Sequence, residues 1–188
     1  MALWAVGLGL AIVKARAVAA AGVAPALPNL LSLPPSAVAA AAWLLTLAGV
    51  GLRVWAAGNL EKNRFTRPTG PYRLVRHPLY LGTLLISLGF FASLGAPVAG
   101  GLLWLALLGG VFLPVLRKEE RELDARFPRY AAYLRGVPAL LPGAASVGAA
   151  LASDRFTWDR ARRNYGLRAL LFLALVPVLN AILVRAAG

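Results

Sequence analysis

Long uninterrupted apolar segments dominate the pattern of hydrophobic and polar positions along this chain. A helix that crosses a bilayer needs roughly 20 predominantly apolar residues. Residues 36–57 meet that requirement, and Ser36 is suited to cap the first turn. Two further apolar segments, 79–95 and 97–116, are joined by a short uncharged link. The tight link predicts an antiparallel helical hairpin, with Pro97 near the start of its second helix.

The two ends of the chain are less uniform. Residues 167–185 form the last clear apolar span, interrupted by one proline, whereas residues 2–13 are too short to span. Lys14 and Arg16 follow the apolar segment 2–13. In a secretory signal peptide the positive charge precedes the apolar run, so this order does not fit one. Two arrangements stay open: residues 2–13 lie in the interface and 17–33 span, or one longer helix carries both cations inside the bundle. We therefore predict an all-α polytopic integral membrane protein with four or five transmembrane helices.

Composition supports this fold class and excludes several others. Of the 188 residues, 60% are hydrophobic and 14% charged, against roughly 45–50% and about 25% in soluble domains. This excess of apolar residues argues against both a soluble globular domain and a disordered chain. Cysteine is absent, so disulfides and thiolate catalysis are excluded. With His77 as the single histidine, we expect no multi-histidine metal site.

The positive charge is distributed as in membrane proteins. The net charge is +13, and of the 20 Lys and Arg, five lie in 58–78 and eleven in 117–168. The link around residues 95–97 carries no charge. This asymmetry follows the positive-inside rule, so both basic stretches are expected to face the cytosol and anionic lipids rather than nucleic acid. All seven acidic residues lie in the same stretches, so a site is expected on the cytosolic side.

The first candidate motif is 70–82, GPYRLVRHPLYLG. Pro78 disfavours helix at His77 and suits the first helical position, which places Tyr80 in the first turn. A helix N-terminus offers unpaired N–H groups to a carboxylate or phosphate. Further donors nearby are Tyr72, Arg73 and Arg76. The same residue types also suit a cationic interfacial anchor with a capping histidine.

The second candidate motif is 117–142, RKEERELDARFPRYAAYLRGVPALLP. We expect the preceding helix to continue through 117–127 and to break near Pro128. Glu119 and Glu120 then lie at its membrane end, beside the hairpin partner that begins at residues 77–78. A carboxylate there can accept hydrogen bonds from ribose hydroxyls or attract a cationic sulfonium.

A solvated, salt-bridged helical extension is the alternative for these charges. Glu122 and Arg126 have the spacing for such an ion pair. Tyr130, Tyr133 and the segment 137–142 are expected to fold back over the site as a lid.

Together these motifs resemble the isoprenylcysteine carboxyl methyltransferase family and its phospholipid methyltransferase relatives. They read Arg76-His77-Pro78-Leu79-Tyr80-Leu81-Gly82, Glu119-Glu120-Arg121-Glu122-Leu123, Phe127-Pro128-Arg129-Tyr130-Ala131-Ala132-Tyr133 and Val137-Pro138-Ala139-Leu140-Leu141-Pro142. The resemblance implies a membrane methyltransferase that uses S-adenosylmethionine in a cytosolic pocket. By motif, the implied cofactor contacts are His77, Tyr80, Leu81, Glu119, Glu120, Tyr72 and Tyr133.

We expect one domain over residues 1–188, with its motif core at 70–142 and an interfacial segment and last helix at 143–188. The resemblance transfers no role to 143–166, which suits an amphipathic interfacial segment or an active-site lid. Gly100, Gly101, Gly109 and Gly110 allow close helix packing, either within the hairpin or in a dimer, so the oligomeric state stays open. Abundant Ala, Leu and Arg with scarce Lys hints at a prokaryotic inner membrane.

The predicted function is methyl transfer to a lipophilic or lipid-like acceptor at the membrane. Glu120 and Arg117 are the candidate catalytic residues: a carboxylate for deprotonation of an amine or thiol, and a cation to position an anionic acceptor. Tyr80 is a second candidate base. A Rossmann-type methyltransferase is excluded, because no strand-loop-helix Gly-x-Gly-x-x-Gly unit is present. Two alternatives remain: an NADPH-dependent enzyme like the sterol reductases, and a non-catalytic membrane module that binds a lipid or a partner.

Overall fold

The computed structural model describes residues 29–31, 34–61, 68–94, 97–127, 130–143, 146–164 and 166–187. The two arrangements predicted for the N-terminal segment concern residues 2–33, nearly all of which lie outside the described residues. All regular structure in the described part is helical.

Three helices in the described part are long and apolar enough to cross a membrane. They are Ala37–Asn59, Val98–Arg126 and Gly166–Arg185, and the apolar helix Pro78–Ala92 is shorter. Large apolar side chains on them face outward; Leu44 is 69% exposed and Leu171 68%. Exposed apolar surface of this extent is typical of a face that meets lipid rather than water. The prediction of an all-α polytopic membrane protein is therefore confirmed.

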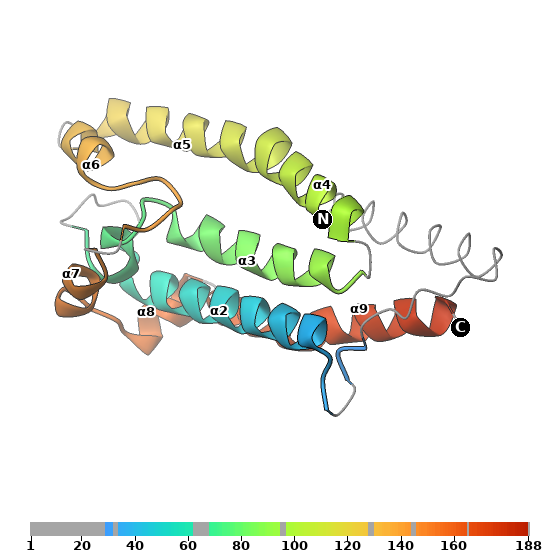
Figure 1. Ribbon diagram of the computed structural model, residues 1–188. Helices are drawn as coiled ribbons and strands as arrows, with labels where there is room; N and C mark the ends of the chain where they lie inside the picture. The colour runs from blue at the N-terminus through green and yellow to red at the C-terminus, as the bar shows by residue number, and fades with distance from the viewer. Residues whose placement is uncertain are drawn as a thin grey trace.

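Successive apolar helices run in alternating directions along the bundle (Figure 1). Helix α2 (Ala37–Asn59) and helix α3 (Pro78–Ala92) lie side by side in opposite directions. Helix α4 (Pro97–Leu107), the π-helical turn η2 (Leu108–Phe112) and helix α5 (Leu113–Arg126) continue one another on the far side of α3. The antiparallel hairpin predicted from the short link is thus confirmed.

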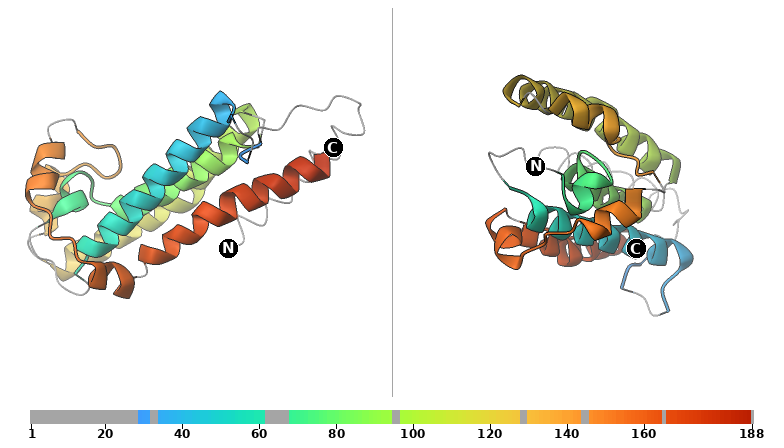
Figure 2. Two further views of the ribbon diagram at one scale, coloured as in Figure 1. Left: turned by 90° about the horizontal axis from the view of Figure 1, so that it is seen from below. Right: turned by 90° about the vertical axis from the view of Figure 1, so that its left-hand side faces the viewer.

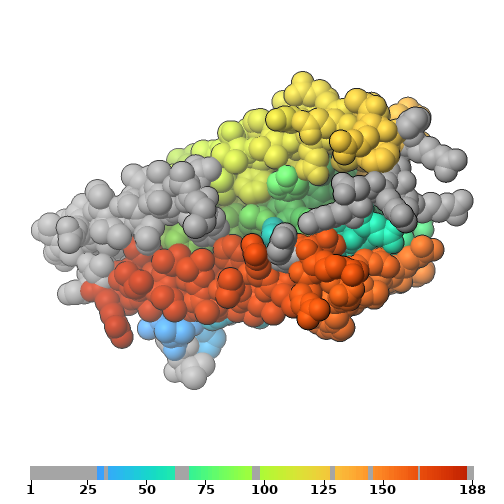
Figure 3. Space-filling view, turned by 180° about the vertical axis from the view of Figure 1, so that it is seen from behind, coloured from blue at the N-terminus to red at the C-terminus, as the bar shows by residue number. Residues whose placement is uncertain are grey.

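The last elements of the chain, from residue 158 on, pack against α2 (Figure 2). A 3-10 turn, η3 (Gly166–Leu170), leads into helix α9 (Leu171–Ala187), which lies at a slant to α2 and α3. From behind, α9 and the segment before it form a continuous band along the molecule (Figure 3). Pro177, the proline within the predicted span, lies inside α9 without ending it. Membrane helices tolerate proline because neighbouring groups satisfy the freed carbonyl.

The short elements gather at one end of the bundle, where α2 and α5 end and α3 begins (Figure 1). They are the 3-10 turn η1 (Gly70–Arg73), α6 (Tyr130–Gly136), α7 (Ser146–Ala152) and α8 (Trp158–Arg163). Each acidic residue of the described part belongs to this end or to the segments that lead to it. The predicted collection of ionisable groups at one membrane side therefore agrees with the arrangement of the helices.

Helices α2 and α3 approach closely because glycines line their contact. A Cβ added at Gly49 would lie 2.5 Å from the Gly82 carbonyl oxygen, and one at Gly89 would lie 2.7 Å from the Ala42 carbonyl oxygen. Small residues of this kind allow helix backbones to touch in a membrane, where dispersion forces and polar contacts replace the hydrophobic drive. The position of α3 on α2 is therefore fixed over most of its length.

The glycines singled out from the sequence behave differently from one another. A Cβ at Gly100 would lie 2.7 Å from the Phe91 carbonyl oxygen. Gly100 therefore allows close packing within the hairpin, which is one of the two roles predicted for these glycines. A Cβ at Gly101, Gly109 or Gly110 would meet nothing within 4 Å. Those three glycines therefore take no part in packing within the described part of the chain.

Two predicted details of α2 and α5 are confirmed. Ser36 caps α2, because its hydroxyl accepts a hydrogen bond from the Ala39 N–H at 3.2 Å. The third apolar segment continues past Leu116 as a helix to Arg126. Pro114 lacks the N–H that an α-helix would bond to the Gly110 carbonyl, and the turn before it is wound wider, with the Leu113 N–H on the Leu108 carbonyl.

Candidate functional site

A break in the backbone positions His77. Helix α3 begins at Pro78, as predicted, and His77 precedes it in a non-helical conformation with φ −122° and ψ 61°. The imidazole makes no capping hydrogen bond to α3. It is 4% exposed and is turned toward α5. His77 thus occupies the N-cap position of α3, as the alternative interpretation has it, but its side chain contacts α5 instead of capping the helix.

His77 and Arg76 converge on one carboxylate. His77 Nε2 lies 2.8 Å from Glu120 Oε1, and Arg76 Nε lies 2.8 Å from the same oxygen. The Glu120 side chain is 21% exposed, which makes these contacts stronger than those of a solvated surface pair. We call Arg76, His77 and Glu120 the carboxylate junction. It joins the start of α3 to α5, the juxtaposition predicted from the sequence.

The segment after α6 closes over the carboxylate junction. The Arg76 N–H donates to the Pro138 carbonyl at 2.8 Å, and the His77 N–H donates to the Ala139 carbonyl at 3.2 Å. Arg76 Nη1 donates to the Leu134 carbonyl. The prediction that 137–142 folds back is confirmed. Because these bonds use backbone groups, they hold this segment on the junction whatever its side chains are.

Tyrosine side chains surround the same place. The Tyr133 hydroxyl donates to the Tyr72 carbonyl at 2.7 Å, and the Tyr130 ring meets the Tyr133 ring edge-on with centroids 5.6 Å apart. Burial and the nearby Glu120 charge raise the pKa of Tyr130 to about 12. Burial also raises the pKa of Tyr133. Both phenols therefore keep their protons at neutral pH and act as hydrogen-bond donors.

Glu119 lies beside the carboxylate junction without a cation of its own. No ion pair joins Glu119 to a cation in the described part of the chain, and its side chain is half-buried. It lies close enough to the Tyr80 hydroxyl to interact with it. The Tyr80 ring meets both His77 and Phe112 edge-on, each with centroids 5.9 Å apart. Glu119 is thus an acid with spare acceptor capacity beside an aromatic wall.

Arg53 reaches this region from the last two turns of α2. Its Nη1 donates to the Leu79 carbonyl at 3.0 Å and to the Thr83 hydroxyl. The arginine side chain therefore joins α2 to the first turns of α3. A Cβ at Gly82 would lie 2.5 Å from Arg53 Cγ, so the glycine makes room for the arginine stem.

The remaining predicted residues are less central. Leu81 is half-buried, and its N–H donates to the His77 carbonyl at 2.9 Å within the first turn of α3. Arg117 is exposed on α5 and makes no ion pair among the described residues. Arg76, rather than Arg117, is the cation that meets Glu120. Glu122 lies 3.8 Å from Lys118 instead of forming the predicted pair with Arg126.

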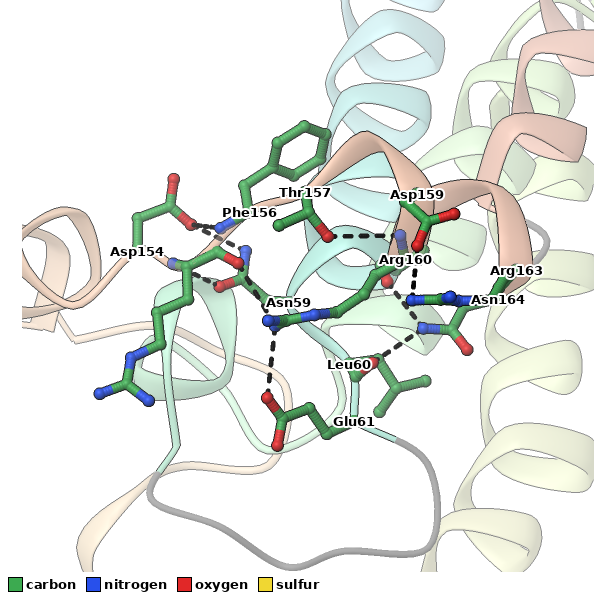
Figure 4. A network of polar contacts seen from close by, with 12 residues as sticks. Asn59, Leu60, Glu61, Asp154, Phe156, Thr157, Asp159, Arg160, Arg163 and Asn164 are labelled. Carbon is green, nitrogen blue, oxygen red and sulfur yellow. Dashed lines mark hydrogen bonds and ion pairs between the residues drawn. The ribbon is translucent and has the colours of Figure 1, made fainter.

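A second polar network fastens the segment 153–164 to the end of α2 (Figure 4). Asp154 Oδ1 accepts hydrogen bonds from Trp55 Nε1 at 3.0 Å and from Asn59 Nδ2 at 2.8 Å. Asn164 Nδ2 donates to the carbonyls of Ala57 at 2.9 Å and Leu60 at 2.8 Å. Sequence reasoning missed this brace, because Asn59, Asp154 and Asn164 belong to no motif. Their amide and carboxylate groups at the end of an apolar span were the available signal.

Comparison with known proteins gives partial relatives. The chain is 39% identical over 100 residues to the cobalt-zinc-cadmium resistance protein CzcN of Cupriavidus metallidurans, covering 52% of this chain and 45% of that protein. It is 33% identical over 100 residues to the nickel-cobalt-cadmium resistance protein NccN of Alcaligenes xylosoxydans xylosoxydans, covering 52% and 46%. It is 44% identical over 72 residues to methanethiol S-methyltransferase 2 of Bradyrhizobium diazoefficiens, covering 38% and 26%.

These similarities are limited in extent. The matches span less than half the length of each of these relatives. No family model and no solved structure matches the chain. The similarity to a named S-methyltransferase agrees with the resemblance seen in the motifs, and supports methyl transfer at this coarse level. Within the described residues, no three His, Cys, Asp or Glu side chains gather where they would hold a metal ion.

Proposed function

We propose that this protein transfers a methyl group from S-adenosylmethionine to a lipophilic acceptor at the membrane. The observation that carries the proposal is Glu119, a half-buried carboxylate without a cation among the described residues, held beside the carboxylate junction and the Tyr80 ring. A buried acid of this kind favours a ligand that brings positive charge or hydroxyl donors. S-adenosylmethionine carries a sulfonium, an ammonium group and two ribose hydroxyls, so the residues present fit it.

The proposed cofactor contacts are His77, Tyr80, Leu81, Glu119, Glu120, Tyr72 and Tyr133. Glu119 would attract the positive charge or accept from the ribose, and the Tyr80 ring would supply an apolar wall. Both contacts of Glu120 use Oε1, so its other oxygen is the one we assign to the ligand. The carboxylate junction holds Glu120 in place, which makes it a positioning residue as well as the candidate base.

The bound cofactor supplies an electrophilic methyl group. The protein's part is to align acceptor and donor and to exclude water, which is worth about 7–11 kcal/mol of the barrier in well-oriented systems. The backbone bonds from Arg76 and His77 to Pro138 and Ala139 close the site on the side of α6. The Tyr133 hydroxyl, which stays protonated, holds the same segment to the Tyr72 carbonyl.

The acceptor is proposed to be a small or lipid-like apolar molecule that enters from the bilayer. The methanethiol named for one relative makes a thiol the first class to test. We place the protein in a bacterial inner membrane with this site toward the cytosol, because the basic stretches lie at the same end of the bundle. The metal resistance named for two relatives is a property of those proteins, and we propose no metal-binding role here.

The test is calorimetric titration of the purified protein in lipid nanodiscs. S-adenosylmethionine and S-adenosylhomocysteine are expected to bind saturably, and NADPH is expected not to bind. Binding of NADPH alone would replace the proposal with a reductase. If folded protein binds none of the three, the non-catalytic membrane module becomes the better account.

A further inference from the structure

The exposed face of helix α7 is apolar. Val147 and Leu151 lie one helical turn apart and are both exposed, Leu151 to 63%. Another side of α7 packs inward, because Ala150 is fully buried. A helix that meets water carries polar residues on the face away from the core. The reversed pattern of α7 is typical of a helix that lies against lipid.

Helix α8 adds an aromatic ring and a cation at the same end of the bundle (Figure 1). Trp158 begins α8 and is 68% exposed, and Arg162 is exposed four residues later. Helical spacing therefore places the two side chains next to each other. Tryptophan is enriched at membrane interfaces, because its ring is apolar and its N–H is polar. An arginine beside such a ring keeps its stem on apolar surface while its charged end reaches the headgroups.

Two arginines of this segment have no acid as a partner. Arg155 and Arg162 are both exposed, and no ion pair joins either of them to an acid in the part of the chain that the structure describes. The acids of the segment are engaged elsewhere. Asp159 pairs with Arg163 at 2.6 Å, and Asp154 accepts hydrogen bonds from side chains at the end of α2. An anionic lipid headgroup has the charge that complements the two arginines.

The segment is held at the level where a membrane span ends. Helix α2 has 23 residues, about the length that crosses a bilayer. Asp154 and Asn164 fasten the segment to the last residues of this helix (Figure 4). A Cβ added at Gly58 would collide with the Phe156 ring, so this ring rests directly on the α2 backbone. These contacts place α7 and α8 beside the headgroup region.

We infer that the segment 146–163 is a binding surface for anionic phospholipid, at the membrane face where α2 ends. Val147, Leu151 and Trp158 enter the boundary between headgroups and acyl chains. Arg155 and Arg162 bind the phosphate of a headgroup. The segment therefore has the interfacial role rather than that of a lid, and the inference does not depend on methyl transfer.

The depth of the segment is measured with a fluorescent label. The chain has no cysteine, so Ala152→Cys gives the full-length protein a single labelling site on the exposed side of α7. In nanodiscs that contain spin-labelled lipid, we expect quenching of this label to be several-fold stronger than that of a label at Glu122→Cys. Glu122 is the matched position, because it is exposed on α5 beyond the apolar part of that helix. Equally weak quenching at both positions would overturn the inference.

The choice of lipid is measured by titrating the labelled protein in uncharged detergent with phosphatidylglycerol, phosphatidylcholine or inorganic phosphate. Phosphatidylglycerol is expected to bind saturably, phosphatidylcholine to bind about tenfold or more weakly, and inorganic phosphate to leave the label unchanged. Arg155→Gln combined with Arg162→Gln should weaken phosphatidylglycerol binding by about 25-fold, because each cation at an anionic surface contributes about fivefold.

Arg121→Gln combined with Arg126→Gln is the matched control. It removes the same charge from two exposed arginines of α5 that make no ion pair among the described residues, and it should bind phosphatidylglycerol as the wild type does. The inference is overturned if the two double variants bind phosphatidylglycerol equally, or if phosphatidylcholine binds as tightly. Displacement of the lipid by inorganic phosphate at equal concentration would also overturn it, because the site would then be one for a free anion. The quenching and the comparison of lipids need no charge variant, so they decide the question even if a double variant does not fold.

Discussion

His77 Nε2 and Glu120 Oε1 lie 2.8 Å apart although 43 residues separate them in the chain. The contact joins the residues just before and at the start of the helical hairpin to α5, the continuation of its second helix. Arg76 shares the same oxygen, so one carboxylate oxygen holds both residues that precede α3. This arrangement also fixes the position of Glu119, the residue that precedes Glu120 on α5.

Replacing Glu120 by glutamine is expected to destabilise the protein. The amide keeps the shape of the side chain but leaves the Arg76 guanidinium without its counter-charge. We expect a loss of about 1–3 kcal/mol in the free energy of unfolding, measured by titration with sodium dodecyl sulfate. Glu122→Gln is the control, because Glu122 is 66% exposed and pairs only with an exposed lysine. Equal stability of the two variants would contradict the role of the carboxylate junction.

The close contact of α2 and α3 predicts a sharp difference between two glycines. Gly49→Ala places a Cβ against the Gly82 carbonyl and the Ile86 backbone nitrogen, at 2.5 and 2.9 Å. The helices must separate, at a cost of about 1–3 kcal/mol. Gly101→Ala meets nothing within 4 Å and should be neutral or slightly stabilising. Detergent-resistant thermal unfolding of both variants measures the difference, and a stable Gly49→Ala protein would refute this packing.

Tyr130 makes the stability depend on high pH. Its pKa is raised from 10.0 to about 12 in the folded protein, first by burial and then by the Glu120 charge. The folded state keeps the phenol proton to higher pH than the unfolded state does. The contribution of Tyr130 to the free energy of unfolding is therefore fully present below pH 10 and is lost as the pH rises toward about 12. Tyrosinate absorbance should show this titration, and Tyr130→Phe should reduce the fall in stability. A Tyr130 pKa near 10.0 in the folded protein would contradict this prediction.

Asn164 is expected to anchor the segment 153–164. Its amide donates to two carbonyls at the end of α2, groups that a helix C-terminus leaves unsatisfied. Asn164→Asp removes both donors and should expose the peptide bonds around residues 153–157 to proteolysis. Asp159→Asn, which breaks only an exposed pair with Arg163, is the control. Equal cleavage rates for the two variants would argue against the brace.

The order of the apolar segments and turns could be predicted from the sequence because span length and proline position act locally. Segments 36–57, 79–95 and 97–116 needed only small changes of boundary, and Pro78 marked the start of α3. The approach of 76–77 to Glu120 could also be predicted, since a tight hairpin brings the two ends together.

Partners that depend on a third element could not be predicted. Arg53 has the sequence position of an interfacial cation, and only the glycine at position 82 on α3 lets its stem cross inward. Asp154 and Asn59 are 95 residues apart and belong to no periodic pattern. The choice of Lys118 over Arg126 as the neighbour of Glu122 depends on side-chain conformations that spacing alone leaves open.

The most direct test of the proposed function compares S-adenosylhomocysteine affinity in three forms of the full chain: wild type, Glu119→Gln and Glu122→Gln. Calorimetry in nanodiscs is expected to show binding by the wild type and by Glu122→Gln with the same affinity. Glu119→Gln should bind about tenfold or more weakly, because a charged acceptor is replaced by a neutral one. Equal affinity in all three forms, or no binding by the wild type, would contradict the assignment of Glu119 to the cofactor.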